Sequence, residues 1–223
     1  MNVAPQYLTP GTFVDSDHPG VLAFAQQHTD PGQNLRERAV ALFYAVRDGF
    51  RYNPYILHFK AEDMKASAFL HRTEGHCVDK ANLYAAVCRA VGVPSRLHFA
   101  NVRNHIGTAR LEEFLKSDVL VFHGYAEVYL DGRWVVATPA FNRELCTRVG
   151  VAPLEFDGVQ DALFQEYTAA QDDSGPRRFM EYLHDHGHFA DWPRERFLAT
   201  MKKHYGHLFT PERMEAMGLR VSW

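Results

Sequence analysis

Cysteine is scarce in this chain of 223 residues, which contains only three. Three cysteines cannot all pair with one another, and a secreted module built on disulfide bonds would carry a larger and even number. No apolar run approaches the ~20 residues that cross a bilayer, and residues 1–15 lack the basic start and apolar stretch of a signal peptide. We therefore predict a cytoplasmic protein without a membrane partner.

An excess of charge of one sign is also missing. The 24 Lys and Arg residues are balanced by 27 Asp and Glu residues, and no long run of Lys or Arg occurs. This balance excludes electrostatic binding of nucleic acid and favours a small or neutral partner. Because 46% of the residues are hydrophobic, the chain is not disordered. At this length one large domain can bury roughly 70% of the surface of the unfolded chain.

The spacing of apolar residues predicts helices and strands in the first two thirds of the chain. Helices are expected at Leu35–Val46 and at the alanine-rich Val78–Val91, which Gly92 and Pro94 end. A strand is expected at Arg96–Val102. The remaining predicted elements of this part are a short helix at Leu111–Lys116 and a hairpin of strands Val119–Leu130 and Trp134–Ala137, joined by the turn Asp131-Gly132.

Beyond Asn142 the sequence predicts mostly helices, at Arg177–Asp185, Arg194–Tyr205 and Pro211–Met217. The order of elements indicates an α+β fold, in which helices pack against an antiparallel sheet. We predict a core with an N-terminal arm at residues 1–142. Residues 143–223 are predicted to form a mostly helical C-terminal extension that packs on this core.

Cys77 lies at the first turn of the most regular predicted helix, a position that favours a reactive cysteine. Unpaired N–H groups and the helix dipole at an N-terminus stabilise a thiolate, which is the nucleophilic form of cysteine. An isolated cysteine more often only fills space in a core. His123 begins the first hairpin strand, and a strand beside the N-terminus of a core helix would bring its imidazole to Cys77. The pair is typical of nucleophilic acyl transfer.

Two motifs resemble the transglutaminase-like superfamily. Glu74-Gly75-His76-Cys77, followed by Lys80–Arg96, is similar to the nucleophile helix of that superfamily. His123–Tyr129 with Gly132-Arg133-Trp134 is similar to its histidine strand and hairpin. The two motifs together are specific, although each alone is weak. The resemblance covers about residues 35–142.

The resemblance implies a papain-like core in which Cys77 is the nucleophile and His123 is the general base and acid. Members of the superfamily usually carry an aspartate four residues after the hairpin tryptophan, and here that position is Thr138. Either Thr138 or Asn142 would then orient His123, as an asparagine does in papain-like proteases. Alternatively, Thr138-Pro139 only ends the strand.

The function expected from these residues is cysteine-dependent acyl transfer or hydrolysis of a peptide or small amide substrate through a Cys77 thioester, without a cofactor. The backbone N–H of Cys77 is one expected oxyanion donor, and His76 and Tyr125 are candidates for the second. A rival interpretation is a catalytically silent module that binds a peptide in the same cleft. The sequence leaves the oligomeric state open.

Several other residues invite weaker interpretations. The thirteen histidines include His184, His186 and His188, which with Asp191 suggest a metal-dependent hydrolase as a third possibility. Their alternate spacing instead favours a solvated turn, and we predict no metal site. A packing role is predicted for Cys88, no role for Cys146, and for Glu127 a salt bridge with an arginine such as Arg96 or Arg133.

Overall fold

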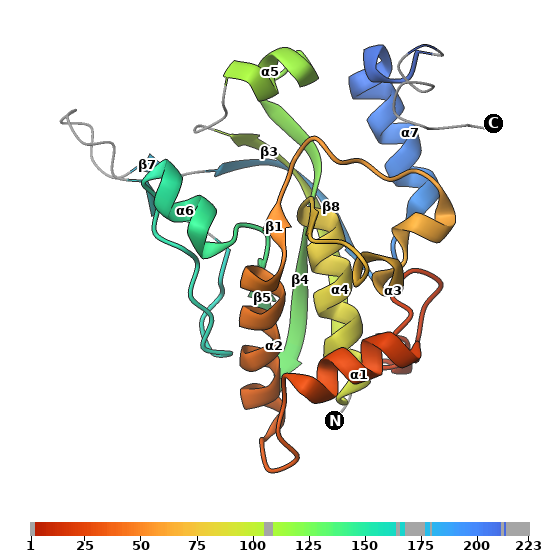
Figure 1. Ribbon diagram of the computed structural model, residues 1–223, viewed down its shortest axis with the longest axis vertical. Coiled ribbons are helices and arrows are strands. Elements are labelled where there is room, and N and C mark those ends of the chain that lie inside the picture. Colours follow the sequence, from red (N-terminus) through yellow and green to blue (C-terminus); the bar gives the residue numbers. More distant parts are fainter. Residues whose placement is uncertain are drawn as a thin grey trace.

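Helix α4 (Cys77–Ala90) is the element on which the other elements pack (Figure 1). All its residues from Cys77 to Arg89 are buried. Three helices contact α4, and strands β3 and β4 also pack against it. The three helices are α1 (Pro19–Gln27), α2 (Leu35–Gly49) and α3 (Ala66–Phe69). The computed structural model describes residues 3–104, 109–163, 166–167, 177–178, 180–210 and 212.

The main sheet has the strand order β5-β4-β3-β8, and each neighbouring pair is antiparallel. Its strands are β3 (Ser95–Asn104), β4 (Val119–Leu130), β5 (Arg133–Ala137) and β8 (Met180–Phe189). Ala100 pairs with His123 and Val102 pairs with Leu120, so β4 has one residue more than β3 between these pairs. This extra residue makes a β-bulge directly before His123, and Phe122 within it has a positive φ of 60°.

Shorter elements surround the sheet and α4. Strands β1 (Arg51–Tyr52) and β2 (Glu74–Gly75) are parallel and lead into α4. The others are η1 (Pro5–Tyr7), η2 (Ala61–Met64), α5 (Ala109–Leu115), α6 (Arg143–Val149), β6 (Glu166–Tyr167), β7 (Arg177–Arg178), α7 (Arg194–Tyr205) and η3 (Gly206–Leu208). None of the helices within the described ranges is both long and apolar enough to span a membrane.

The structure confirms the predicted α+β class and its antiparallel sheet. The predicted helices and strands between Leu35 and Ala137 are present, as is the helix at Arg194–Tyr205. The helix predicted at Pro211–Met217 falls almost entirely outside the described residues. The division of the chain at residue 142 stays a prediction.

The helix predicted at Arg177–Asp185 is wrong, because Met180–Phe189 forms β8 at the edge of the sheet. The histidine segment His184–His188 is likewise part of this strand and not a solvated turn. Gly187 within β8 has a positive φ of 86°. The strand depends on pairing with β3, which is about eighty residues away in the sequence, so a local pattern does not indicate it.

Buried polar side chains on α4 hold neighbouring segments in place. The ammonium of Lys80 donates hydrogen bonds to the carbonyl oxygens of Arg47 and Phe50 at the end of α2, at 2.7 and 2.8 Å. Burial lowers the pKa of Lys80 to about 7. The amide of Asn82 donates to the carbonyl oxygens of Phe13 and Met64. These bonds satisfy backbone carbonyls that would otherwise be buried without a partner.

His98 connects three strands of the sheet. Its Nδ1 lies 2.5 Å from a carboxylate oxygen of Glu127 on β4, and its Nε2 lies 2.6 Å from Asp185 on β8. Glu127 also binds Arg96, which confirms the predicted salt bridge. Burial lowers the pKa of His98, but the hydrogen bonds to both carboxylates outweigh burial, so the pKa lies above its usual value.

Replacing His98 with Gln should therefore destabilise the protein in a way that depends on pH. A histidine with a raised pKa in the folded state contributes stability that is complete below its unfolded pKa of about 6.5 and is lost as the pH rises through the folded pKa. We expect H98Q to lower the free energy of unfolding by about 1–2 kcal/mol near pH 5.5 and by less near pH 9. Denaturant unfolding at both pH values measures this difference.

The matched control is His71→Gln, which changes an exposed histidine. Its effect should be small at both pH values. An equal loss of stability in H98Q at low and high pH would contradict the interpretation that the charged ring links the three strands.

Candidate active site

Cys77 is the first residue of α4 and is 7% exposed. Burial, with a smaller effect of the Asp79 charge, raises the pKa of its thiol to about 12, although the backbone N–H groups of Gly124, Val78 and Cys77 itself act in the opposite direction. The predicted position of Cys77 at a helix N-terminus is thus confirmed. These N–H groups would stabilise a thiolate once the cost of burial is reduced.

A close approach between α4 and β4 brings these donors to the sulfur. A Cβ atom on Gly124 would lie 2.9 Å from Cγ2 and 3.0 Å from the Cα atom of Val78. Only glycine allows the strand to come this near to the first turn of the helix. Gly124 directly follows His123, so the same approach brings the histidine strand to Cys77.

His123 lines one small cavity together with Cys77, His76 and Tyr52. The cavity has a volume of about 50 Å³. The imidazole of His123 is 1% exposed, and burial, with a smaller effect of His76, lowers its pKa to about 4. Neither ring nitrogen has a hydrogen-bond partner in the described part of the chain. Cys77 and His123 thus line the same cavity, but neither ring nitrogen of His123 is hydrogen bonded to the thiol.

The two predicted orienting residues do not bind His123. Thr138 is buried, and its hydroxyl has no hydrogen-bond partner within the described ranges. Asn142 precedes α6, and its side-chain oxygen accepts a hydrogen bond from the backbone N–H of Tyr52 at 3.0 Å. Their predicted role therefore stays a prediction, and among the residues that the structure describes no side chain forms a hydrogen bond with His123 in place of the aspartate.

Helix α7 forms part of the cavity wall, which sequence reasoning missed. Phe197, Met201 and Tyr205 face the cavity that Cys77 and His123 line. The Tyr205 hydroxyl donates to the carbonyl oxygen of Val119 at 2.6 Å and accepts from the N–H of Val121 at 2.8 Å, on the bulged part of β4. The helix itself was predicted, but no local motif indicates where it packs.

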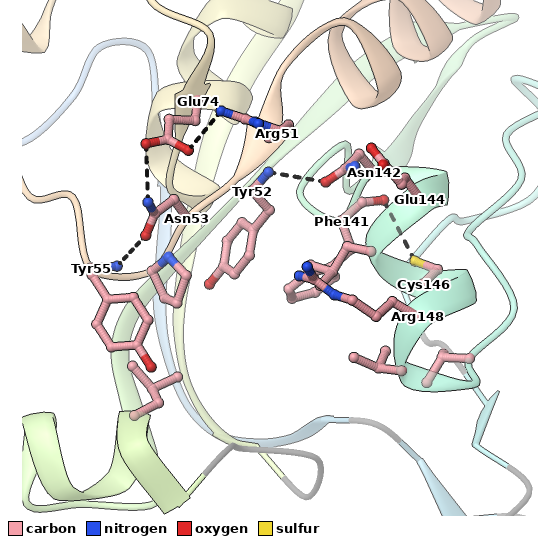
Figure 2. A pocket seen from close by; sticks show the side chains of 15 residues that line it. Arg51, Tyr52, Asn53, Tyr55, Glu74, Phe141, Asn142, Glu144, Cys146 and Arg148 are labelled. Atoms are coloured by element: carbon pink, nitrogen blue, oxygen red, sulfur yellow. Dashed lines mark hydrogen bonds and ion pairs between the residues drawn. The ribbon is translucent and has the colours of Figure 1, made fainter.

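A larger pocket has a volume of about 470 Å³, and Figure 2 shows the side chains that line it. Tyr52 and Pro54 line both this pocket and the small cavity, so Tyr52 stands between the larger pocket and Cys77. The ring of Tyr52 packs edge-on against Phe141, with ring centroids 4.6 Å apart. The larger pocket carries both charges and aromatic rings, from Arg51, Tyr55, Glu74, Phe141, Glu144 and Arg148 among others.

A second histidine in the small cavity is paired with a carboxylate. Nδ1 of His76 lies 2.5 Å from a carboxylate oxygen of Asp79, and both side chains are buried. Burial raises the pKa of Asp79, but the charge and hydrogen bonds of His76 outweigh burial, so the pKa lies below its usual value. Nε2 of His76 has no partner among the residues that the structure describes. Tyr125, the other predicted oxyanion donor, stacks on His98 instead.

The other cysteines and the histidine-rich segment were the remaining candidates for a functional role. None of the three cysteines, all of which are described, forms a disulfide bond. Cys88 is fully buried, in agreement with its predicted packing role, and Cys146 lines the larger pocket. Within the described residues, no three or more His, Cys, Asp or Glu side chains are arranged to hold a metal ion. Asp191 instead accepts hydrogen bonds from the backbone N–H groups of residues 12–14.

Comparison with known proteins agrees with this fold. The model of the transglutaminase-like superfamily matches residues 22–139, which is more than half of the chain. The protein therefore belongs to the transglutaminase-like superfamily. No curated protein matches the sequence.

Two solved structures are similar to part of this chain. One is a proposed cysteine protease from Cytophaga hutchinsonii, with 19% identity, a TM-score of 0.47 and coverage of 60% of this chain and 40% of the other. The second is a proposed protease from Parabacteroides distasonis, with 16% identity, a TM-score of 0.38 and coverage of 56% and 25%. This chain thus spans less than half the length of either structure.

The close approach at Gly124 can be tested with Gly124→Ala. The added methyl group would contact the backbone of Val78, so β4 must move away from α4. We expect the free energy of unfolding to fall by about 1–3 kcal/mol, as in other overpacked cores. Gly49→Ala is the control, because a Cβ there meets nothing within 4 Å. Equal stability of the two variants in denaturant unfolding would contradict the packing described here.

Proposed function

We propose that the protein is a cysteine-dependent hydrolase or acyltransferase that acts on a peptide or small amide. The observation that carries this proposal is the position of Cys77. Backbone N–H groups act on its sulfur, and the residue lines the same cavity as two imidazoles. Cys77 attacks the carbonyl carbon and forms a thioester, while the amine leaves with a proton from an imidazole. Water or a second amine then releases the acyl group.

The electrostatics of the closed cavity keep the reacting groups neutral. Burial raises the pKa of Cys77 to about 12 and lowers that of His123 to about 4. A thiol and a neutral imidazole are therefore the stable pair until substrate enters. Transfer of the proton becomes favourable as the carbonyl oxygen gains negative charge and the N–H groups at the start of α4 stabilise it.

The larger pocket supplies a place for the substrate. Its volume of about 470 Å³ accommodates a short peptide segment, and its aromatic walls suit apolar side chains. Because Tyr52 lines this pocket and the small cavity, a carbonyl group bound against Tyr52 would be near the nucleophile. Side-chain movement of Tyr52 would join the two spaces.

A second candidate function is peptide binding without catalysis. The observation that favours it is that neither ring nitrogen of His123 has a hydrogen-bond partner in the described residues. In addition, Thr138 stands where relatives usually carry an aspartate. Such a module would use the larger pocket in the same way. It would not need an activated Cys77.

Reactivity of the thiol distinguishes the two functions without knowledge of the natural substrate. Although the closed cavity holds Cys77 as a neutral thiol, we expect it to react with iodoacetamide near neutral pH at least tenfold faster than a free thiol, because an imidazole takes the thiol proton as the sulfur attacks. p-Nitrophenyl acetate should acetylate the same residue and release p-nitrophenol in a burst. Mass spectrometry of peptides locates both modifications.

Two cysteine variants give the matched comparison. Cys77→Ser should abolish labelling and the burst, whereas Cys146→Ser, which changes the cysteine that lines the larger pocket, should retain both. If Cys77 is labelled no faster than a free thiol, the enzyme hypothesis fails and the binding module is favoured.

A further inference from the structure

His123 has no carboxylate to support a positive charge. In a nucleophile–histidine pair, the third residue fixes the ring and stabilises the imidazolium ion that forms. Here neither nitrogen of His123 has a partner in the described ranges, and burial disfavours its charged form. A proton accepted by this ring would create a buried and unpaired cation, which is costly.

His76 has the support that His123 lacks. Its Nδ1 lies 2.5 Å from the buried carboxylate of Asp79, and its side chain is only 7% exposed. An ionised Asp79 accepts a hydrogen bond, so Nδ1 carries the proton and Nε2 has the lone pair. Nε2 is buried without a partner among the described residues, and His76 lines the cavity of Cys77. This is the arrangement of a carboxylate-oriented general base.

We propose that His76, oriented by Asp79, exchanges the proton with Cys77 and is the acid–base residue of the reaction. The inference rests on the proposed function, because it assigns a catalytic residue to the same site. Asp79 is a positioning residue, since it acts through His76. The aspartate that is missing beside His123 thus has a counterpart on helix α4, two residues after the nucleophile.

The proton balance of the reaction follows from this assignment. Nε2 of His76 takes the thiol proton as the sulfur–carbon bond forms and the carbonyl electrons move to oxygen. Collapse of this intermediate breaks the carbon–nitrogen bond, and Nε2 returns the proton to the leaving amine. In hydrolysis, Nε2 then takes a proton from water as oxygen bonds to carbon, and the departing sulfur regains a proton.

Other titratable groups face His76. The charge of His76 lowers the pKa of Asp79 on α4, of His123 on β4 and of His58 in the loop after β1. Trp192 also lies against His76, with ring centroids 6.3 Å apart. Asp79 is the only one of these that supplies a negative charge by direct contact with the ring.

Asp79 also stabilises the start of α4, and an experiment must distinguish this structural role from its proposed effect on His76. Its carboxylate accepts the backbone N–H of His76 at 3.1 Å, which caps the start of α4. Asp79→Asn keeps an oxygen for this hydrogen bond but removes the charge. His76→Asn places a favoured N-cap residue at position 76 and removes the imidazole. Thermal unfolding should show that both variants remain folded.

The decisive experiment measures the rate constant for alkylation of Cys77 by iodoacetamide between about pH 6 and pH 9. Near pH 7 we expect H76N to lower the rate about 10–100-fold and D79N about tenfold, since charge-assisted hydrogen bonds have this magnitude. Because the charge of Asp79 raises the pKa of the Cys77 thiol, a lower rate in D79N cannot come from a less acidic thiol. The H76N/D79N double variant should be no slower than H76N, because Asp79 acts through His76.

His123→Gln gives the matched comparison at the second imidazole. A smaller loss of reactivity in H123Q than in H76N supports the assignment. Two results overturn it: an H76N rate within about twofold of the unchanged protein, or an equal loss from D79N with and without His76. Slow labelling of the unchanged protein would overturn the proposed function as well, so the two failures are distinguishable.

Discussion

The contact between Gly124 on β4 and Val78 on α4 is the constraint on which the site depends. It allows backbone N–H groups from both elements to meet at the sulfur of Cys77, and it brings His123 into the same cavity. The surrounding helices shield this contact from solvent. Helices α1 to α3 bury α4 on one side, and α7 closes the cavity through Phe197, Met201 and Tyr205. A side chain at position 124 would separate α4 from β4, so the same contact determines both the position of the N–H groups and the burial of Cys77.

Burial has opposite effects on the chemistry of the site. It strengthens each hydrogen bond to the sulfur, since the local dielectric is low, but it also raises the cost of every unpaired charge. The pKa values of Cys77 and His123 are displaced towards neutral forms for this reason. Charge separation in such a cavity requires compensation by a nearby opposite charge. Catalysis in this fold is therefore limited by where a carboxylate can be placed more than by the presence of a cysteine and a histidine.

Features that depend on neighbouring residues could be predicted from the sequence, and features that depend on distant pairing could not. The alanine-rich period of α4 and the Asp131-Gly132 turn indicate their elements directly, and Cys77 with His123 follows from the two motifs. Strand β8 was predicted as a helix, because its strand conformation comes from pairing with β3. The position of α7 over the cavity has no local signal either. His76 was considered only as an oxyanion donor, since its contact with Asp79 involves side-chain geometry rather than spacing.

The first turn of α4 holds a carboxylate more rigidly than the segment after β5, where the family usually carries its aspartate. Thr138 lies where β5 has ended, and its hydroxyl is buried without a partner in the described chain. Asp79 lies within the first turn of α4, so its distance from Cys77 is set by helical geometry and by the cap that it forms with the His76 N–H. The same carboxylate can thus satisfy the helix N-terminus and orient an imidazole beside the nucleophile. If His76 is the acid–base residue, as proposed, an aspartate directly after β5 is not needed for charge compensation, and a threonine at position 138 is compatible with a reactive Cys77.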